Sequence, residues 1–325
     1  MYNAGGWYDI FLQGNIDSYS WLQHQGKRKA RGNQKLFMGP FGHGDLSGDL
    51  EYPTDLKERR QREELRWFNY WLKGEKNGIM DDPAVTYYMM AGARKGAFSP
   101  KNEWRTAADW PPPHTPTPLY LQEEQGLAWQ PPASPDAATT YIFDPKSPVP
   151  TFGGNNLTIK KGPMDQRAVG ERDDYFRFNT EPLTEDVVIA GPVTMDLWVA
   201  TDRPDTDFMV KLVDVYPDGY EAIVLDNPLR ARFRNGQNPE DVAMMPRDTP
   251  VKLSIDLWST ALTFEAGHRI GVHITSSNYP RFDVNPNTGV PTMNPGSARN
   301  TVFHNQGHPS ALLLPLAAEP AAGKN

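Results

Sequence analysis

The pattern of apolar and polar residues divides the chain into a first part of mixed helices and strands and a longer second part of strands. In residues 11–24, apolar side chains recur at spacings of three and four, which predicts an amphipathic helix. Residues 35–38 form a short apolar run that ends before Gly39-Pro40, and residues 84–90 form another run. Short buried runs separated by helices are typical of parallel strands in an α/β sheet.

The clearest helical pattern covers residues 54–73. Thr54 is a suitable N-cap, and Gly74 follows the last helical residue. An apolar stripe runs along one side of this helix, and we expect its aromatic residues to pack in the core rather than to line a ligand site. The stripe consists of Leu65, Phe68, Trp71 and Leu72, and the neighbouring aromatic residues are Trp67 and Tyr70.

A proline-rich segment separates the two parts. Residues 111–118 contain five prolines and suit a stiff, extended connector. At 325 residues the chain is long enough for two domains, each with its own core. We place the domain boundary near Trp110, so that residues 1–110 form the first domain and residues 111–325 the second.

After this boundary the chain contains short β-rich runs at fairly even intervals, separated by turn residues such as Pro217-Asp218-Gly219. Residues 194–199 alternate polar with apolar side chains, as a strand with one solvated face does. The number of runs fits a jelly-roll β-sandwich of about eight strands or slightly more. The predicted strands are residues 119–121, 140–143, 175–178, 187–189, 193–200, 208–215, 221–225, 251–257 and 269–275.

Composition and charge exclude several classes of function. The net charge is −7 and the densest basic cluster, residues 27–31, is short, so we expect no nucleic-acid partner. No apolar run approaches the roughly twenty residues that a membrane helix needs, so we expect no membrane partner either. Cysteine is absent, which excludes disulfides, thiolate metal sites and a cysteine nucleophile.

Two glycine-rich loops each carry one residue that can take part in proton transfer. Asp9 follows the segment Gly5-Gly6-Trp7-Tyr8, and His43 lies between Gly42 and Gly44. A carboxylate bonded to one imidazole nitrogen holds the tautomer in which the other nitrogen can take a proton from a serine hydroxyl. Acid before histidine is also the second half of the Ser, Asp, His order of α/β-hydrolases. Spacing alone leaves open the alternative that Asp9 caps a helix and His43 is a surface residue.

The segments GGWYDIF (residues 5–11) and QKLFMGPFGHGDLSG (residues 34–48) resemble those of the cocaine esterase and α-amino acid ester hydrolase family, which is related to the Xaa-Pro dipeptidyl-peptidases. In that family the Asp of the GWYD motif and the His of the GP-x-x-H motif are the triad acid and base. The resemblance therefore implies these roles for Asp9 and His43. It also implies a jelly-roll second domain. The resemblance continues through residues 66–74, 172–173, 180–183, 205–208, 212–215, 267–270 and 308–310.

The motif that would carry the nucleophile of the triad is missing. A serine on a strand-to-helix elbow needs Gly-x-Ser-x-Gly, and this pattern does not occur in the sequence. Few residues precede Asp9, so we expect Met1 to be an internal methionine and the chain to begin inside or just after a strand. The predicted fold is the C-terminal part of an α/β-hydrolase domain, with the triad Asp and His, followed by a jelly-roll β-sandwich.

We therefore expect a serine hydrolase of the acyl esterase or dipeptidyl-peptidase type, which cleaves an ester or amide bond and is inactive without its serine. The expected partner is a small ester, amide or short peptide substrate. No cofactor is expected, and a homo-oligomer is left open. The alternative is a noncatalytic jelly-roll module that binds carbohydrate or a protein partner beside a vestigial hydrolase segment. Its exposed aromatic candidates are Trp129, Tyr220, Trp258 and Tyr279.

Two clusters invite a metal site, and neither has the right spacing. The four aspartates within residues 202–214 do not follow the EF-hand pattern, so we expect structural roles at turns and strand ends. His304 and His308 lie four residues apart, but Gly307 and Pro309 preclude the helix that would bring both imidazoles to one face. The sequence therefore predicts no metal ligands.

Overall fold

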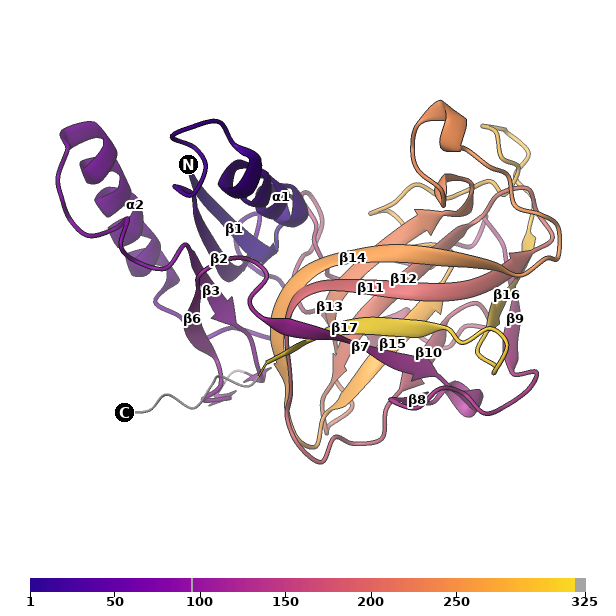
Figure 1. Cartoon of the computed structure of the whole chain (residues 1–325). Coiled ribbons are helices and arrows are strands. Elements are labelled where there is room, and N and C mark those ends of the chain that lie inside the picture. Colours follow the sequence, from indigo (N-terminus) through magenta and orange to yellow (C-terminus); the bar gives the residue numbers. More distant parts are fainter. Residues whose placement is uncertain (95, 319–325) are drawn as a thin grey trace.

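Figure 1 shows two regions: an α/β layer, formed by residues 2–107, and a β region of antiparallel sheets, formed by residues 114–317. The computed structural model describes residues 1–94 and 96–318. Within these residues, no helix is both long and apolar enough to cross a membrane. A mixed α/β part followed by antiparallel sheets confirms the predicted fold class at this level.

The sheet of the α/β layer places the two glycine-rich loops side by side. Its strands β1 (Tyr2–Tyr8), β2 (Lys35–Gly42) and β3 (Val85–Met89) run parallel, and β2 and β3 correspond to the two predicted apolar runs. Strand β6 (Glu103–Ala107) pairs with β3 in the antiparallel direction, and the order is β1-β2-β3-β6. Among the residues that the structure describes, β1 is therefore an edge strand, paired with β2 alone.

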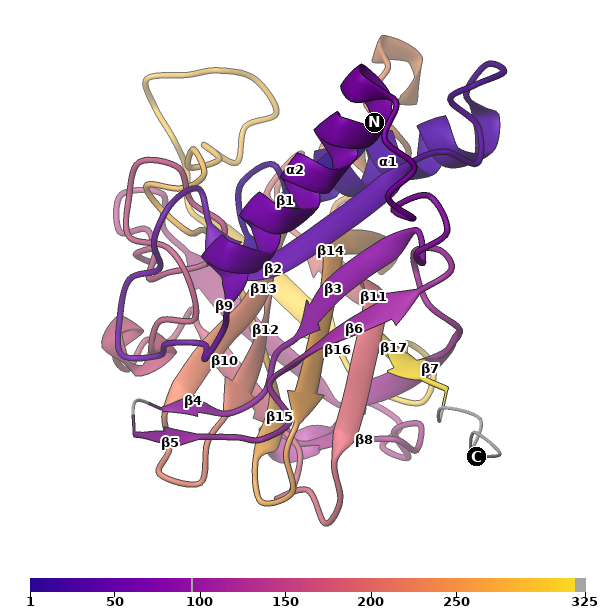
Figure 2. The same ribbon diagram turned by 90° about the vertical axis from the view of Figure 1, so that its left-hand side faces the viewer.

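Two helices cover opposite faces of this sheet (Figures 1 and 2). α1 (Leu12–Gln25) lies on the side of the β region and buries Leu12, Ile16 and Tyr19. α2 (Leu56–Lys73) lies across the outer face, and Trp67 is its one buried residue. The first helix is thus integrated into the interior, whereas the second is attached by a narrow contact.

The ends of α2 agree with the sequence prediction at one end only. Gly74 adopts the left-handed conformation, with φ 73°, and its backbone N–H donates to the carbonyl of Asn69. At the other end the helix begins after Asp55 and no side chain caps it, so the prediction that Thr54 is the N-cap was wrong. The chain enters the helix with Asp55, at φ −89° and ψ 28°, as the last residue outside it.

The expectation that the aromatic residues of α2 pack in the core is confirmed for Trp67, which is buried, and was wrong for Phe68 and Trp71, which are exposed. Leu65 is 61% exposed, Phe68 54% and Leu72 78%. The helix is rotated so that Trp67 faces the sheet, where its ring centroid lies 5.8 Å from that of Tyr2. The exposed residues of the stripe, Leu65, Phe68 and Leu72, therefore point outward.

The β region consists of two antiparallel sheets. The order of the smaller sheet is β10 (Phe176–Asn179), β15 (Arg269–Thr275), β12 (Asp207–Val215) and β13 (Glu221–Arg230). The larger sheet has the order β8 (Leu127–Ala128), β7 (His114–Leu121), β17 (Ala311–Ala317), β11 (Val187–Thr201), β16 (Ala298–Phe303) and β9 (Ala138–Phe143), and β14 (Val251–Phe264) also pairs with β11.

A few short elements complete the described chain. A two-stranded ribbon precedes β6, and single turns of 3₁₀ helix lie in the connections of the β region. The ribbon is β4 (Ala93–Arg94) with β5 (Ala97–Phe98), and the 3₁₀ helices are Glu123–Gln125, Gln166–Val169, Ala231–Phe233 and Pro239–Asp241.

Several strands differ from the sequence prediction, and β6 and the two-residue strands β4, β5 and β8 were not predicted. The runs at 187–189 and 193–200 are one strand, β11, because a register shift between Pro192 and Thr194 lets pairing with β14 continue past Gly191, whose φ is 143°. β16 and β17 were not predicted. β16 carries Arg299 and Asn300 in a mostly polar sequence, and β17 contains a proline, so neither has a strong β pattern.

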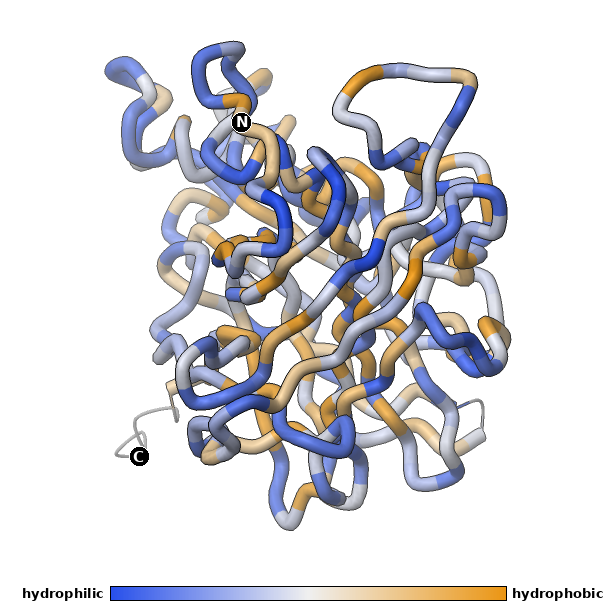
Figure 3. Tube along the Cα trace, turned by 90° about the vertical axis from the view of Figure 1, so that its right-hand side faces the viewer, coloured by the Kyte–Doolittle hydropathy of each residue, from blue (hydrophilic) through white to orange (hydrophobic). Residues whose placement is uncertain are grey.

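One hydrophobic core runs through both regions. The same cluster of buried residues contains Trp7 and Tyr88 of the α/β layer and Leu197 and Phe264 of the β region. The chain after β3 also joins the two regions by backbone hydrogen bonds, since Met90 N–H donates to Ala261 O and the Thr263 N–H donates to Met90 O. Figure 3 shows hydrophobic residues along the interior strands and hydrophilic residues at the peripheral loops. The boundary near residue 110 stays a prediction.

Candidate active site

The carboxyl ends of β1 and β2 bring Asp9 and His43 together. Because these neighbouring strands are parallel and Tyr8 is in register with Gly42, the residues that follow them leave the sheet at the same edge. The Oδ2 atom of Asp9 lies 3.4 Å from Nδ1 of His43. This distance is slightly longer than that of an ordinary N–H···O hydrogen bond.

Asp9 is held by its own turn and still faces the histidine. Its backbone N–H donates to the Gly6 carbonyl at 3.0 Å, and its Oδ1 atom accepts the Phe11 N–H at 3.0 Å. Oδ2 remains for the imidazole, and the side chain is only 12% exposed. The side chain of Asp9 therefore organises the turn before α1 and pairs with His43 at the same time, so the two interpretations of this residue are not exclusive.

Glycine is required where the two strands end, because their backbones come close together. A Cβ added at Gly6 would lie 2.1 Å from the Phe41 carbonyl oxygen, and one added at Gly39 would lie 2.7 Å from the Phe41 ring. The approach at Gly6 is shorter than any van der Waals contact, so a side chain there would separate β1 from β2, whereas a side chain at Gly39 would collide with the Phe41 ring of its own strand. The glycine-rich motifs thus reflect the close approach that sets the distance between Asp9 and His43.

His43 lies at the wall of an open cavity of about 680 Å³. Its side chain is 52% exposed, and the ring of Phe11 packs edge-on against it with a centroid distance of 5.4 Å. Within residues 1–94 and 96–318, no group bonds to the Nε2 atom. Nδ1 faces a carboxylate while Nε2 is available, which is the arrangement of a general base. Other residues that line the cavity are Gly5, Asn15, Phe41, Asp45, Leu56 and Arg60.

No serine in the described chain is placed to act as the nucleophile of this pair. Ser18 lines the same cavity, but it lies on α1 and its hydroxyl donates to the Gly14 carbonyl at 2.8 Å. The backbone N–H of Ser47 donates to the Lys161 carbonyl at 2.8 Å. The structure therefore places a candidate acid and base together and offers them no hydroxyl on an elbow.

Two residues of the β region contact this site, and sequence reasoning missed both. The amide of Asn155 donates to the carbonyl oxygens of Trp7 and Asp9, at 2.9 and 3.0 Å. The Nζ atom of Lys161 donates to the carbonyl oxygen of His43 at 2.8 Å. The glycines around them, such as Gly153 and Gly154, indicate a tight loop, but no spacing in the sequence links that loop to the first fifty residues.

The other histidines have partners that do not form a second site. His268 and Asp214 are 2.8 Å apart and nearly buried. Burial opposes the charge of His268, yet the carboxylate of Asp214 prevails and raises the pKa of His268 above its ordinary value. His24 lies 2.9 Å from Asp109 on the surface. In the described residues, no group of three or more potential ligands could hold a metal ion.

The aspartates of residues 202–214 take structural partners in the β region. Asp205 accepts the backbone N–H of Arg232 at 3.0 Å, and Asp207 forms an ion pair with Arg230 at 3.0 Å. Each carboxylate is thus occupied by a donor of the protein itself, in agreement with the expected roles at turns and strand ends.

A sequence model of the X-Pro dipeptidyl-peptidase C-terminal non-catalytic domain matches residues 77–313. The chain belongs to this family. Asp9 and His43 both precede the part that matches this domain. The family includes serine hydrolases, and the chain is related to serine esterases and peptidases through their C-terminal half.

Individual relatives extend the match to the first residues. The cocaine esterase of a Rhodococcus species is 32% identical over 339 residues, which covers 96% of this chain and 55% of the esterase. The structure of an α-amino acid ester hydrolase superposes with a TM-score of 0.82 at 28% identity and covers 97% of this chain and 55% of that protein. An aminopeptidase from a marine sediment archaeon of the Thaumarchaeota gives 0.82 at 27% identity, with 98% and 55% covered. This chain thus spans about half the length of these relatives.

Proposed function

We propose that Asp9 and His43 are the acid and the base of a Ser-Asp-His triad that hydrolyses esters or amides. The observation that carries this proposal is the distance of 3.4 Å between Asp9 Oδ2 and His43 Nδ1 at the ends of adjacent parallel strands. The membership of the chain in a family of serine hydrolases supports it. The expected substrates are small esters, amides or short peptides, and the fold proposed for the two β sheets is the jelly roll.

In the proposed reaction, His43 Nε2 takes the proton of a serine hydroxyl while the serine oxygen attacks the substrate carbonyl carbon. The proton then passes to the leaving alcohol or amine as its bond to that carbon breaks. Water repeats both steps on the acyl-serine, with His43 again as base and then as acid. Asp9 holds the Nδ1–H tautomer and stabilises the imidazolium that forms in each step.

The serine in this proposal comes from polypeptide outside the 325 residues. Three features support that view. The sequence has no Gly-x-Ser-x-Gly motif, β1 is an edge strand beside the pair, and α2 presents exposed apolar residues such as Leu72 on the outer side of the same sheet. An edge strand and an apolar helix face are surfaces that a further part of an α/β sheet would cover. The 325-residue chain by itself is then inactive.

The test joins residues 1–325 to the part of the Rhodococcus cocaine esterase that this chain does not match, and measures hydrolysis of p-nitrophenyl acetate. We expect no turnover above buffer for the 325-residue chain and clear turnover for the fusion. In the fusion, His43→Ala should lower kcat about 10³-fold or more, because the serine loses its base. His24→Ala, at an exposed histidine that also pairs with a carboxylate, is the matched control and should leave kcat unchanged.

Two results would contradict the proposal. Turnover by residues 1–325 alone would place a nucleophile within them. A fusion that folds, as judged by its circular dichroism and cooperative melting, but keeps its activity after His43→Ala would remove the base from the mechanism. A folded fusion without any turnover would likewise count against Asp9 and His43 as its acid and base.

No observation favours the alternative of a carbohydrate-binding module. That interpretation needs exposed aromatic side chains on the β region. Tyr220 is 2% exposed, and Trp129 and Trp258 are partly buried against the hydrophobic core. Of the four candidates, Tyr279 is the one that is half exposed, and a single aromatic residue does not make a sugar-binding platform.

A further inference from the structure

We propose that the loop Gly153–Gly162, which we call the clamp loop, positions the catalytic acid and base although it belongs to the domain described as non-catalytic. The inference rests on the proposed function of Asp9 and His43. The clamp loop lies within the matched residues 77–313, far along the chain from both. It contacts the turn after β1 and the turn after β2, and thereby fixes one against the other.

Asn155 holds the turn that carries the acid. It is 1% exposed, and its side-chain amide donates to the carbonyl oxygens of Trp7 and Asp9 at 2.9 and 3.0 Å. These carbonyls flank the end of β1, so both protons of one amide group fix the direction in which the chain leaves the sheet. Trp7 is itself anchored, because its indole N–H donates to the Tyr88 carbonyl at 2.8 Å.

Lys161 holds the turn that carries the base. Its Nζ atom donates to the carbonyl oxygen of His43 at 2.8 Å and to that of Leu157, within the clamp loop, at 3.1 Å. Its aliphatic stem lies against Gly42, where an added Cβ would be 2.7 Å from Lys161 Cδ. The backbone carbonyl of Lys161 also accepts the Ser47 N–H at 2.8 Å. The lysine is thus fixed at both its ends.

The clamp loop is a rigid support because it closes on itself. The backbones of Gly154 and Gly162 exchange two hydrogen bonds, of 2.9 and 3.0 Å. The amide of Asn156 bridges the loop by donating to the carbonyls of Gly153 and Lys160, at 2.6 and 2.8 Å. Gly153 and Gly154 have φ values of 69° and 81°, which allow this tight course. Asn155 and Lys161 therefore move little relative to each other.

The loop also rests on buried charges of the smaller sheet. A Cβ at Gly154 would lie 2.5 Å from Asp226 Oδ1, so the loop backbone sits directly on this carboxylate. Asp226 is paired with Arg281 and accepts the Asn278 amide at 2.8 Å. A buried ion pair with further hydrogen bonds resists displacement, because moving one partner leaves the other charge unpaired. The clamp loop thus ties the positions of Asp9 and His43 to the smaller sheet of the β region.

Catalysis depends steeply on such positioning, since a shift of about 1 Å can lower the rate about 10²-fold. The pair is 3.4 Å apart and depends on two turns, so a small movement of either turn separates it. Asn155 and Lys161 are positioning residues in this proposal: they contact backbone carbonyls and no reacting atom. Their effect should be visible in the protonation pattern of the His43 ring, which a purely stabilising residue would leave unchanged.

The experiment measures the tautomer of His43 by ¹⁵N NMR of the 325-residue chain, at a pH where the imidazole is neutral. In the unmodified chain we expect the Nδ1–H form, because Nδ1 faces the Asp9 carboxylate. The variant Asp9→Asn gives the tautomer population of His43 when the carboxylate partner is lost. Asn155→Leu, which keeps the volume and removes both donors, should shift the population at least half of the way toward that value.

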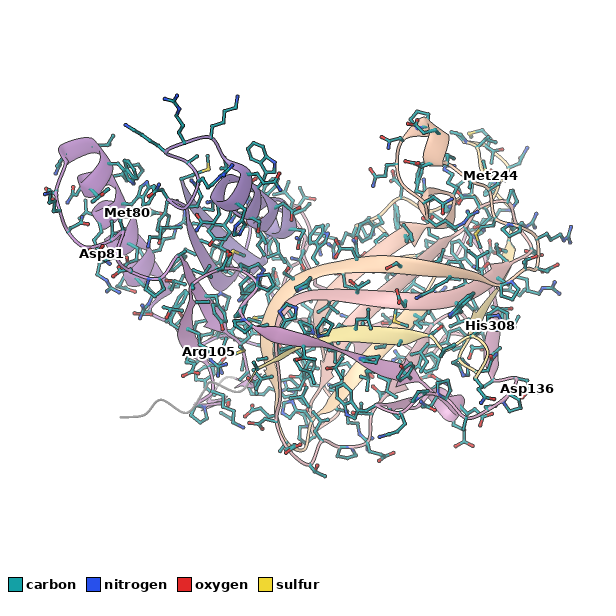
Figure 4. All side chains as sticks on the ribbon, in the orientation of Figure 1. Met80, Asp81, Arg105, Asp136, Met244 and His308 are labelled. Atoms are coloured by element: carbon teal, nitrogen blue, oxygen red, sulfur yellow. The ribbon has the colours of Figure 1, made fainter. Side chains whose placement is uncertain are left out.

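The matched control is Asn305→Leu. Asn305 is also buried, at 5% exposed, and its amide donates to the Ala137 carbonyl at 3.1 Å. It is hydrogen-bonded to His308, which lies at the end of the β region away from the α/β layer (Figure 4). This variant should lose stability in thermal unfolding without any change at His43. If Asn155→Leu does not fold, Lys161→Met removes the ammonium, keeps the stem, and should produce a smaller shift in the same direction.

The outcomes separate the two proposals. If Asp9→Asn leaves the tautomer unchanged, the pairing of Asp9 with His43 is wrong, and with it the proposed function. If Asp9→Asn changes the tautomer but the folded Asn155→Leu and Lys161→Met variants do not, the acid and base pair survives and the clamp is wrong. A change in Asn305→Leu equal to that in Asn155→Leu would show a general loosening and would also overturn the clamp.

Discussion

The β region and the α/β layer bury their apolar side chains very differently. In β12 every residue from Asp207 to Asp214 is buried, because the strand has neighbours on both sides and is covered on both faces. In α2, by contrast, Trp67 is the one buried residue, and Leu72 is 78% exposed. The β region is closed around its core, whereas the outer face of the α/β layer is covered by a helix that buries a single residue.

This difference explains how firmly each residue of the candidate site is held. The acid, on the side of the α/β layer that contacts the β region, has a side chain 12% exposed and is held by Asn155. The base, one strand further on, has a side chain 52% exposed. We infer that the β region supplies the frame and that the open surface of the layer is where the remainder of the reaction machinery must approach.

The largest expected effect compares one leucine from each region. Leu197 in β11 is fully buried, so Leu197→Ala should lower the free energy of unfolding by about 2–5 kcal/mol, through lost burial and an unfilled cavity. Leu72→Ala, the same substitution on the exposed face of α2, should change it by no more than about 0.5 kcal/mol. Chemical denaturation of both variants measures the difference. Equal losses would mean that α2 is packed in solution and that the layer is not open.

A smaller effect concerns acid sensitivity, which we place in the β region. His273 is completely buried, and this burial lowers its pKa well below the ordinary value, with repulsion from Lys211 and Arg177 acting in the same direction. The unfolded chain therefore binds a proton near pH 6.5 that the folded chain does not, and stability falls as the pH drops below about 6.5, by up to about 1.4 kcal/mol per pH unit for one such group.

Replacing this histidine should isolate that contribution. In the unmodified chain, the Tyr175 hydroxyl lies 2.8 Å from His273 Nδ1. The glutamine of His273→Gln can also form a hydrogen bond to this hydroxyl, but it cannot take up a proton. The variant should show a flatter decline of the free energy of unfolding between about pH 6.5 and pH 5 than the unmodified chain. Urea denaturation at several pH values measures both slopes. Parallel slopes would show that another group causes the acid sensitivity.

How far the sequence could predict the structure depended on the range of the interactions. The parallel strands β2 and β3 follow from local apolar runs, whereas the pairing of Asp9 with His43 was expected from the resemblance to a known family, because spacing alone left it open. Their catalytic role stays a prediction. The exposed stripe with Phe68 could not be foreseen, because a helical period shows which residues share a face but not whether anything covers that face.

Long-range contacts were beyond sequence reasoning for a different reason. Asn155 and Lys161 act through hydrogen bonds to backbone carbonyls more than a hundred residues away, as their partners Asp9 and His43 show. Any residue type can offer such a carbonyl, so the sequence contains no signal for the pairing. The strand β17 was missed because its pairing with β7 and β11 outweighs a proline within it.

The central claim is that Asp9 and His43 act as one unit on an external serine, and a double-mutant cycle tests it most directly. In the fusion with the part of the cocaine esterase that this chain does not match, kcat would be measured for Asp9→Asn, His43→Ala and the double variant. We expect a loss of about 10³–10⁴-fold for Asp9→Asn, and a double variant no worse than His43→Ala within about threefold, because members of one unit are not additive. Losses that multiply in the double variant would show two independent roles and contradict the account.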